Sequence, residues 1–96
     1  MHPSGVIVLD YDGYIAYMET CDPNGFLTTP EHVIGMHVEE AGAATGAKDT
    51  NSMDAFIKTR RHKVQTSFEY EINGIRRCGI LLPRRTFITQ IFHIVL

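Results

Sequence analysis

Two Asx-Gly pairs, each preceded by a segment of β-strand character, constrain the fold of this chain more than any other feature. Asn73-Gly74 follows a run over residues 64–72 in which apolar and polar side chains alternate, and Asp12-Gly13 follows the β-branched segment 5–10. Alternation of this kind is typical of a strand with one buried face. Asx-Gly pairs accept the positive φ angles that two-residue hairpin turns require. The sequence therefore predicts two antiparallel hairpins.

The stretch between the hairpins predicts helices. Residues 49–61 carry apolar side chains at helical spacing and end in two arginines, where cations suit the helix dipole. Four residues at the start of this segment are alternative N-caps: Asp49, Thr50, Asn51 and Ser52. Thr29-Pro30-Glu31 predicts the start of a shorter helix, with an N-cap followed by proline in the first turn, and Gly35 can end it. Residues 41–47 are rich in alanine and glycine and fit either a loop or a loose helical turn.

The remaining segments complete a single domain that spans residues 1–96. Residues 75–82 predict the second strand of the later hairpin, Pro83-Arg84-Arg85 a turn, and residues 86–96 a final strand that is apolar on both faces. A chain of 96 residues with 44% hydrophobic residues has room for one modest core. The expected fold class is α+β: a five-stranded antiparallel sheet with short helices on one face.

Composition narrows the class of protein. Nine basic residues against eleven acidic ones give a net charge of −2, which argues against a dedicated nucleic-acid binder. No apolar run approaches the roughly 18–20 residues of a membrane span, and the first residues do not resemble a signal peptide. Two cysteines, Cys21 and Cys78, fit a reducing compartment, so a cytoplasmic location is expected.

The order of elements and several short motifs resemble the PAS family of sensor domains. The segment GVIVLDYDGYIAY at 5–17 is similar to the opening hairpin of that family, and TPEHVIG at 29–35 is similar to its S-x-E-E-L-I-G motif. FEYEING at 68–74 resembles the strand and turn written E-Y-R…D-G, and IFHIV at 91–95 resembles the final strand. The resemblance covers nearly the whole chain. One departure is Glu19, which stands where the family usually has asparagine.

The resemblance raises the question of a cofactor, and the residues disfavour the two best-known ones. The Asn-Cys-Arg-Phe-Leu-Gln motif of flavin-binding LOV domains is absent, so a flavin adduct is not expected. Haem-binding members supply an axial histidine from the long helix, and the matching position here is Met53, which disfavours His-ligated haem. The histidines lack the spacing of a metal site, and no motif of a hydrolase, P-loop or dinucleotide enzyme occurs. We expect neither a metal centre nor an enzyme.

Two surfaces are candidates for binding. A small-molecule pocket between sheet and helices is expected to be lined by side chains from the hairpins, the helices and the last strands, namely Ile7, Leu9, Ile15, Tyr17, Ile34, Phe56, Phe68, Tyr70, Cys78, Ile80 and Gln90. The alternative is that these residues simply fill the core. Because helices cover only one side of a sheet, a homodimer is expected through the other side, with a contact that includes Val6, Val8, Ile91, His93 and Val95.

The resemblance implies a regulatory role. A PAS-type domain binds a small molecule or a partner and relays the signal to the output domain of a larger protein, such as a histidine kinase of a two-component system, a cyclase or a transcription regulator. The alternative is a PAS-type module for dimerisation and protein interaction that holds no ligand. Neither reading requires nucleic-acid contacts or a membrane span.

Overall fold

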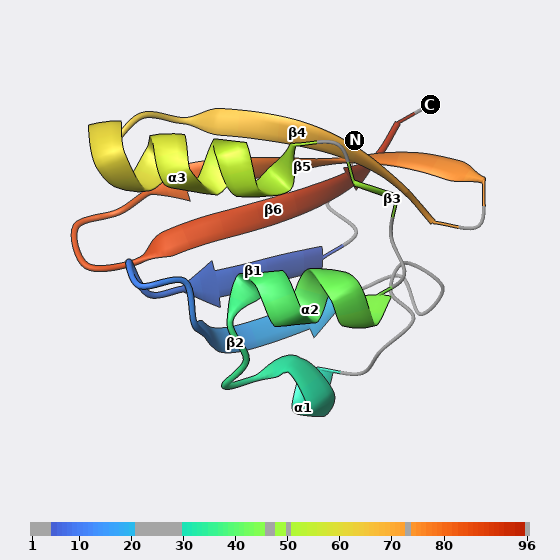
Figure 1. Cartoon of the computed structure of the whole chain (residues 1–96), viewed down its shortest axis with the longest axis horizontal. Coiled ribbons are helices and arrows are strands. Elements are labelled where there is room, and N and C mark those ends of the chain that lie inside the picture. Colours follow the sequence, from blue (N-terminus) through green and yellow to red (C-terminus); the bar gives the residue numbers. More distant parts are fainter. Residues whose placement is uncertain (1–4, 21–29, 46–47, 50, 73, 96) are drawn as a thin grey trace.

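The computed structural model describes residues 5–20, 30–45, 48–49, 51–72 and 74–95. Its strands form one antiparallel sheet in the order β2-β1-β6-β5-β4-β3 (Figure 1). The elements are β1 (Gly5–Leu9), β2 (Ile15–Thr20), α1 (Pro30–Val33), α2 (Val38–Thr45), β3 (Lys48–Asp49), α3 (Ser52–His62), β4 (Thr66–Ile72), β5 (Ile75–Pro83) and β6 (Ile88–Ile94). The predicted α+β class with five antiparallel strands is confirmed, and the two-residue β3 adds a sixth.

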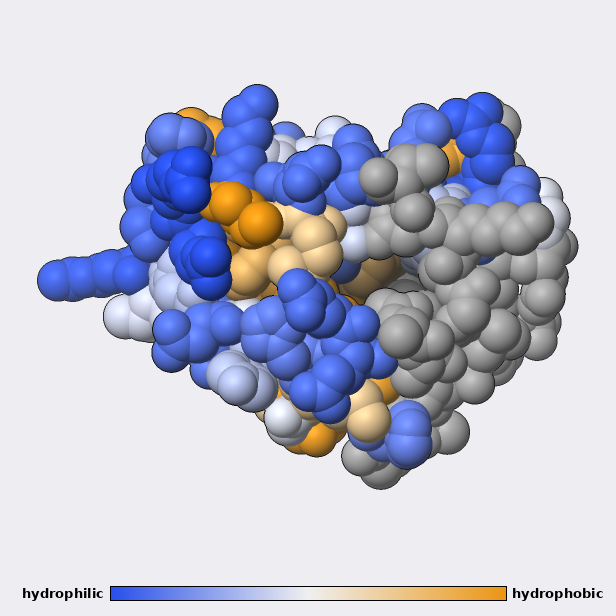
Figure 2. All heavy atoms as spheres, in the orientation of Figure 1, coloured by the Kyte–Doolittle hydropathy of each residue, from blue (hydrophilic) through white to orange (hydrophobic). Residues whose placement is uncertain are grey.

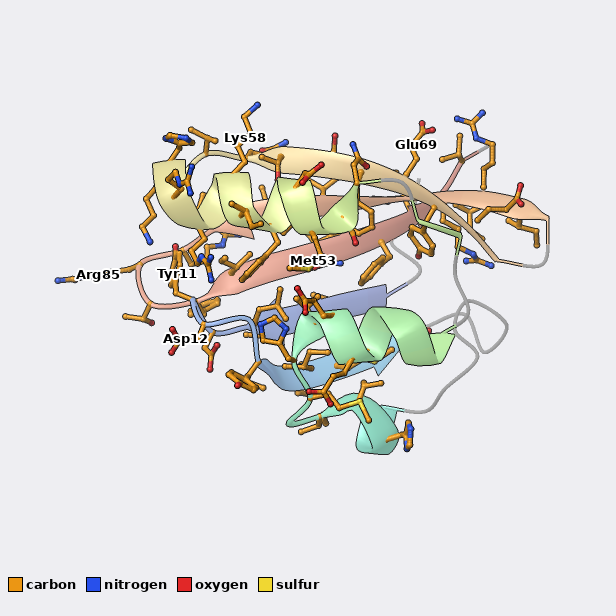
Figure 3. The ribbon with its side chains drawn as sticks, viewed as in Figure 1. Tyr11, Asp12, Met53, Lys58, Glu69 and Arg85 are labelled. Atoms are coloured by element: carbon orange, nitrogen blue, oxygen red, sulfur yellow. The ribbon has the colours of Figure 1, made fainter. Side chains whose placement is uncertain are left out.

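The helices lie on one side of the sheet. In Figure 1, α2 lies in front of β1 and β2, α1 lies beside the β2 edge of the sheet, and α3 lies in front of the other half of the sheet. We call this covered side the inner face and the opposite side the outer face. The space-filling view of the helical side shows apolar side chains gathered between α3 and α2, with hydrophilic residues around them (Figure 2). Met53 of α3 lies in this region and packs against the core (Figure 3).

The turn between β1 and β2 is fixed by hydrogen bonds. Oδ1 of Asp10 accepts bonds from the backbone N–H groups of Asp12 (3.0 Å) and Tyr14 (2.9 Å). Gly13 has a φ of +97°, the left-handed region that the Asp-Gly pair predicted. The ring of His37 lies against Gly13, and its Nε2 is 3.0 Å from the carbonyl oxygen of Asp12. This turn is therefore attached to the start of α2.

Tyr11 connects three segments at the same end of the sheet. Its hydroxyl donates a hydrogen bond to the carbonyl oxygen of Arg84, in the turn between β5 and β6. The ammonium of Lys63 lies 3.3 Å from the centre of the Tyr11 ring, a cation–π contact from the end of α3. Figure 3 shows Tyr11, Asp12 and Arg85 together at this end. Two turns and one helix end are thus held against each other.

The second hairpin has the tight register that Asn-Gly predicts. Ile72 pairs with Ile75, and Gly74 has a φ of +79°. Asn73 itself lies outside the described residues. This register places Gly79 opposite Phe68, whose ring occupies the space above the glycine: a Cβ on Gly79 would lie 2.5 Å from ring carbons.

The long helix begins later than the sequence indicated. Of the four N-caps predicted for the helix over residues 49–61, the structure has Asn51. The earliest start, Asp49, is wrong because Lys48 and Asp49 pair with Glu71 and Tyr70 of β4 as a short strand. The helix α3 therefore starts at Ser52. The helix is attached to β4 by two hydrogen bonds from buried or half-buried threonines: Thr59 to Thr66 (2.7 Å between hydroxyls), and Thr66 to the carbonyl oxygen of Ala55 (3.0 Å).

The other helical predictions have mixed outcomes. The ambiguous segment 41–47 belongs, as far as Thr45, to the helix α2. The short helix α1 starts at Pro30 as predicted but ends at Val33, so Ile34 follows it and is exposed. Proline and an Asn-Gly pair also predict a turn over residues 21–25, which lie outside the described residues. Among the helices that are described, none has the length and apolar character needed to cross a membrane.

Candidate functional site

Most of the residues predicted to line a pocket lie on the inner face. Their side chains are all at most 8% exposed, and all except Gln90 belong to one contiguous hydrophobic cluster. These residues are Ile7, Leu9, Ile15, Phe56, Phe68, Tyr70 and Gln90. The structure therefore brings them together, packed on one another as core side chains.

Tyr17 and Ile34 were also predicted to line the pocket, but neither lies on the inner face. A β-bulge puts an extra residue, Ala16, between the pairs Val8–Tyr17 and Leu9–Ile15, and this reverses the alternation of the strand. Tyr17 is consequently 48% exposed on the outer face, and Met18 takes the buried position. Ile34 lies beyond the last residue of α1 and is 46% exposed.

Cys78 and Ile80 were predicted to line the pocket too, but both lie on the outer face. Residues directly opposite each other in a sheet share a face. Cys78 is opposite Glu69 and Ile80 is opposite Ser67, and both of these β4 residues are exposed on the outer face. The inner face of β5 carries Arg77 and Gly79 instead.

Arg77 is the inner-face residue that the sequence analysis missed. Its side chain is 1% exposed, opposite Tyr70 of β4 and Ile94 of β6. The rings of Tyr70 and Phe92 meet nearby at 5.7 Å in an edge-to-face arrangement. A guanidinium has five N–H donors and is costly to bury unless they find partners. This end of the core therefore combines a permanent positive charge with aromatic surface.

The outer face is apolar in its centre. Ile91 of β6 is flanked by Val6 of β1 and Ile80 of β5, which form a row across three strands. The neighbouring row joins Val8, Thr89 and Leu82 in the same way. No described helix lies over this side (Figure 1). His93 is on the same face, opposite Cys78, and Val95 follows β6 with its backbone bonded to Arg76.

On the outer face, polar pairs border this apolar centre toward both edges of the sheet. On β2, the hydroxyl of Tyr17 donates to the carboxylate of Glu19 at 2.8 Å. On the other side, Arg76 and Glu69 form an ion pair at 2.5 Å, and each side chain is 59% exposed. An apolar centre with a polar border is the usual anatomy of a protein–protein interface. The outer face, defined by these rows and pairs, is our candidate functional site.

We predict that Glu19→Gln lowers the pKa of Tyr17. The hydrogen bond to the Glu19 carboxylate, and its negative charge, raise the pKa of Tyr17 above its ordinary value of 10.0. Because the folded state holds this proton more tightly, the contribution to stability is present below pH 10 and is lost as the pH rises through the raised pKa. The difference between the 295 nm titrations of each protein and its Tyr17→Phe counterpart measures the shift. An unchanged pKa in Glu19→Gln would contradict the assignment.

Comparison of the chain with protein-family models, with curated proteins and with solved structures finds no match. Within the described part of the chain, no three His, Cys, Asp or Glu side chains gather closely enough to hold a metal ion.

Proposed function

We propose that this chain is a PAS-type sensory and regulatory domain, which dimerises through its outer face and relays a signal to an output domain of a larger protein. The observation that carries the proposal is the outer face itself: an apolar row centred on Ile91, bordered by polar pairs and left uncovered by the described helices. The order of two strands, then helices interrupted by the two-residue β3, then three strands supports the same resemblance. The role is one of binding rather than catalysis.

This function has two versions, which differ in whether the domain binds a small-molecule ligand. The resemblance to sensor domains favours the first version, in which a small molecule binds between the sheet and the helices. The close packing of the predicted lining residues favours the alternative, a ligand-free dimerisation module. Mass spectrometry of the denatured, purified protein distinguishes them: a co-purified small molecule supports the first, and its absence the second.

Ile91→Glu is expected to convert a homodimer into a folded monomer. A carboxylate in the middle of an apolar interface is costly to desolvate, and about 3 kcal/mol corresponds to a Kd weakened by a factor of about 100. The side chain of Ile91 is only half-buried in the single chain, so the fold tolerates the charge. Light scattering coupled to size-exclusion chromatography measures the mass, and circular dichroism checks the fold.

Val64→Glu is the matched control, because Val64 is 41% exposed in the connection between α3 and β4, away from the outer face. It introduces the same charge and should leave the dimer intact. Wild-type protein that is monomeric at high micromolar concentration would contradict the proposal. So would a dimer that Val64→Glu weakens as much as Ile91→Glu does.

A further inference from the structure

Two pairs of arginines that are distant in the sequence lie at the same end of the sheet. Arg60-Arg61 is in the last turn of α3, and Arg84-Arg85 is in the turn between β5 and β6 (Figure 1). Tyr11 connects these two segments, because its ring contacts the ammonium of Lys63 and its hydroxyl donates a hydrogen bond to the carbonyl oxygen of Arg84. We call this region the basic end and define it by the segments 10–14, 60–64 and 84–87.

The charges of the basic end are unbalanced. Its cations are exposed, and among the described residues no carboxylate forms an ion pair with any of them: Arg60, Arg61, Lys63, Arg84 and Arg85. The same segments hold two carboxylates, Asp10 and Asp12, and Oδ1 of Asp10 already accepts two backbone hydrogen bonds. The helix dipole accounts for cations at the end of α3 but not for those in the turn. Five positive charges against two negative ones leave an excess of three, so this end attracts anions although the net charge of the chain is −2.

Each connection at the basic end also exposes a large apolar side chain. Tyr14 in the β1–β2 turn is 49% exposed, Val64 before β4 is 41% exposed, and Phe87 before β6 is 40% exposed. They make up half of the six large apolar side chains that are exposed in the described part of the chain. Aromatic rings and long cationic side chains are the usual combination at a membrane interface, where the rings lie at the level of the lipid headgroups.

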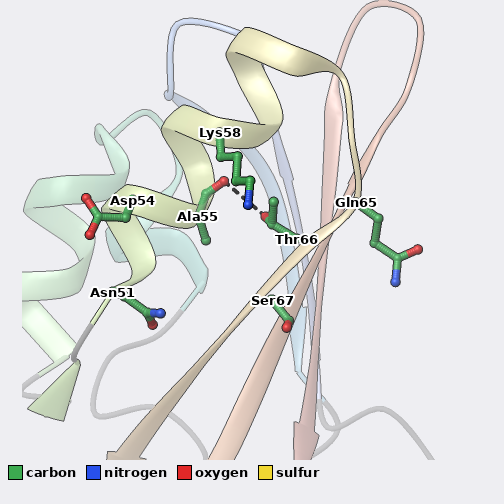
Figure 4. A pocket seen from close by; sticks show the side chains of 7 residues that line it. All are labelled: Asn51, Asp54, Ala55, Lys58, Gln65, Thr66 and Ser67. Atoms are coloured by element: carbon green, nitrogen blue, oxygen red, sulfur yellow. Dashed lines mark hydrogen bonds between the residues drawn. The ribbon is translucent and has the colours of Figure 1, made fainter.

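The shape of the basic end favours a flat partner. Arg85 projects from its turn, away from the rest of the molecule (Figure 3). A polar pocket of about 370 Å³ between α3 and the start of β4 is a different feature, because its one cation, Lys58, is matched by one carboxylate, Asp54 (Figure 4). A projecting tip reaches a flat surface, whereas a peptide is usually held in a groove or along a strand edge.

We propose that the basic end binds to the surface of an anionic lipid bilayer without crossing it. The guanidinium groups pair with lipid phosphates, which match their planar arrangement of donors, and Phe87 and Val64 enter the headgroup region. Each lysine or arginine near such a surface strengthens binding about fivefold. The contact is confined to the tips of three connections, so the outer face stays free and the inference does not rest on dimerisation.

The first test removes one charge at a time. Wild type should sediment with phosphatidylcholine vesicles that contain about 30% phosphatidylserine, not with pure phosphatidylcholine vesicles, and added salt should weaken binding. Arg85→Gln should weaken binding about fivefold. Arg76→Gln is the matched control, because Arg76 is equally charged and exposed but lies at the start of β5. Arg76 is about 25 Å along the strand from the basic end, well beyond the Debye length of about 8 Å, so its loss should leave binding unchanged.

The second test reports on the apolar contact. The chain has no tryptophan, so a single introduced one reports on one position. With the anionic vesicles, the emission of Phe87→Trp should move to shorter wavelength, because the indole ring leaves water. Ile75→Trp is the matched control, since Ile75 is 43% exposed at the opposite hairpin, and its emission should not move. Circular dichroism checks that each variant is folded.

Several outcomes would overturn the proposal. These are absence of binding to anionic vesicles, equal binding to neutral ones, equal weakening by Arg76→Gln and Arg85→Gln, or an emission of Phe87→Trp that does not move more than that of Ile75→Trp. If wild type ignores the vesicles but binds a glutamate peptide or a single-stranded oligonucleotide, the basic end instead recognises an acidic protein segment or a nucleic acid.

Discussion

Gly79→Ala is expected to destabilise the protein by about 3 kcal/mol, at the upper end of the range for overpacked cores. The added Cβ would lie 2.5 Å from two carbons of the Phe68 ring. That ring has little freedom to retreat, because it is 6% exposed and packs against Tyr70 at 5.8 Å and Phe92 at 6.4 Å between centres. Since a domain of this size is stable by only about 5–15 kcal/mol, the loss is a large part of the whole. The midpoint of urea unfolding measures it.

A double-mutant cycle shows whether the clash with Phe68 is the cause. In a Phe68→Ala background the ring is gone, and Gly79→Ala should then cost little. Stability of Gly79→Ala within about 1 kcal/mol of wild type would show that the ring shifts easily. An equal cost in both backgrounds would show that the effect arises elsewhere.

Gly13→Ala is expected to cost about as much, for two reasons that can be separated. Its φ of +97° is strained for any residue with a Cβ, which costs on the order of 1–3 kcal/mol. In addition, the new Cβ would lie 2.5 Å from Nε2 of His37 and would push the ring away from the carbonyl oxygen of Asp12. The turn would lose its attachment to α2 as well as its own geometry. Thermal and urea unfolding measure the total.

Gly35→Ala is the matched control for the cost of placing a Cβ on a residue with a positive φ angle. Gly35 has a similar φ of +92°, but a Cβ there would meet no atom within 4 Å. Its cost should be close to that of the dihedral strain alone, and the excess at Gly13 should disappear when His37 is replaced by alanine. Equal costs at the two glycines would contradict the role assigned to His37.

Much of the fold is visible in the sequence because it depends on local signals. Both Asx-Gly turns, the alternating strands and the amphipathic helix are encoded within a few residues of one another, and each was predicted. The two-residue strand β3 has no such signal. Its pairing with β4 is a tertiary event, and it displaced the predicted start of the long helix from Asp49 to Ser52.

The candidate sites were harder to predict because they depend on which face each side chain takes. On β5 the error was avoidable: Ile72 and Ile75 flank the turn, so counting back from it pairs Phe68 with Gly79 and places Cys78 on the other face. The apolar character of Cys78 and Ile80 suggested burial in the core instead. On β2 the error was not avoidable, because nothing in the sequence marks the bulge at Ala16 that turns Tyr17 outward.

The side chains predicted to form the dimer contact lie on one face of the sheet in the structure. Their role in dimerisation stays a prediction. Val6, Val8, Ile91 and His93 alternate correctly because β1 and β6 have no bulge in their mutual register. Periodicity therefore suffices where strands are regular, and it fails where one residue is inserted.

The strand order has a consequence for how this chain reaches its native state. The hairpin β1–β2 and the meander β4–β5–β6 each form from neighbouring segments, but they join only where β1 meets β6, near opposite ends of the described chain. Closing a loop of about 80 residues costs entropy before any contact repays it, and such non-local pairing slows folding. The rate-limiting step should therefore be the docking of two preformed sub-sheets. Destabilising Leu9 or Ile88, which face each other at that seam, should speed unfolding and slow folding together.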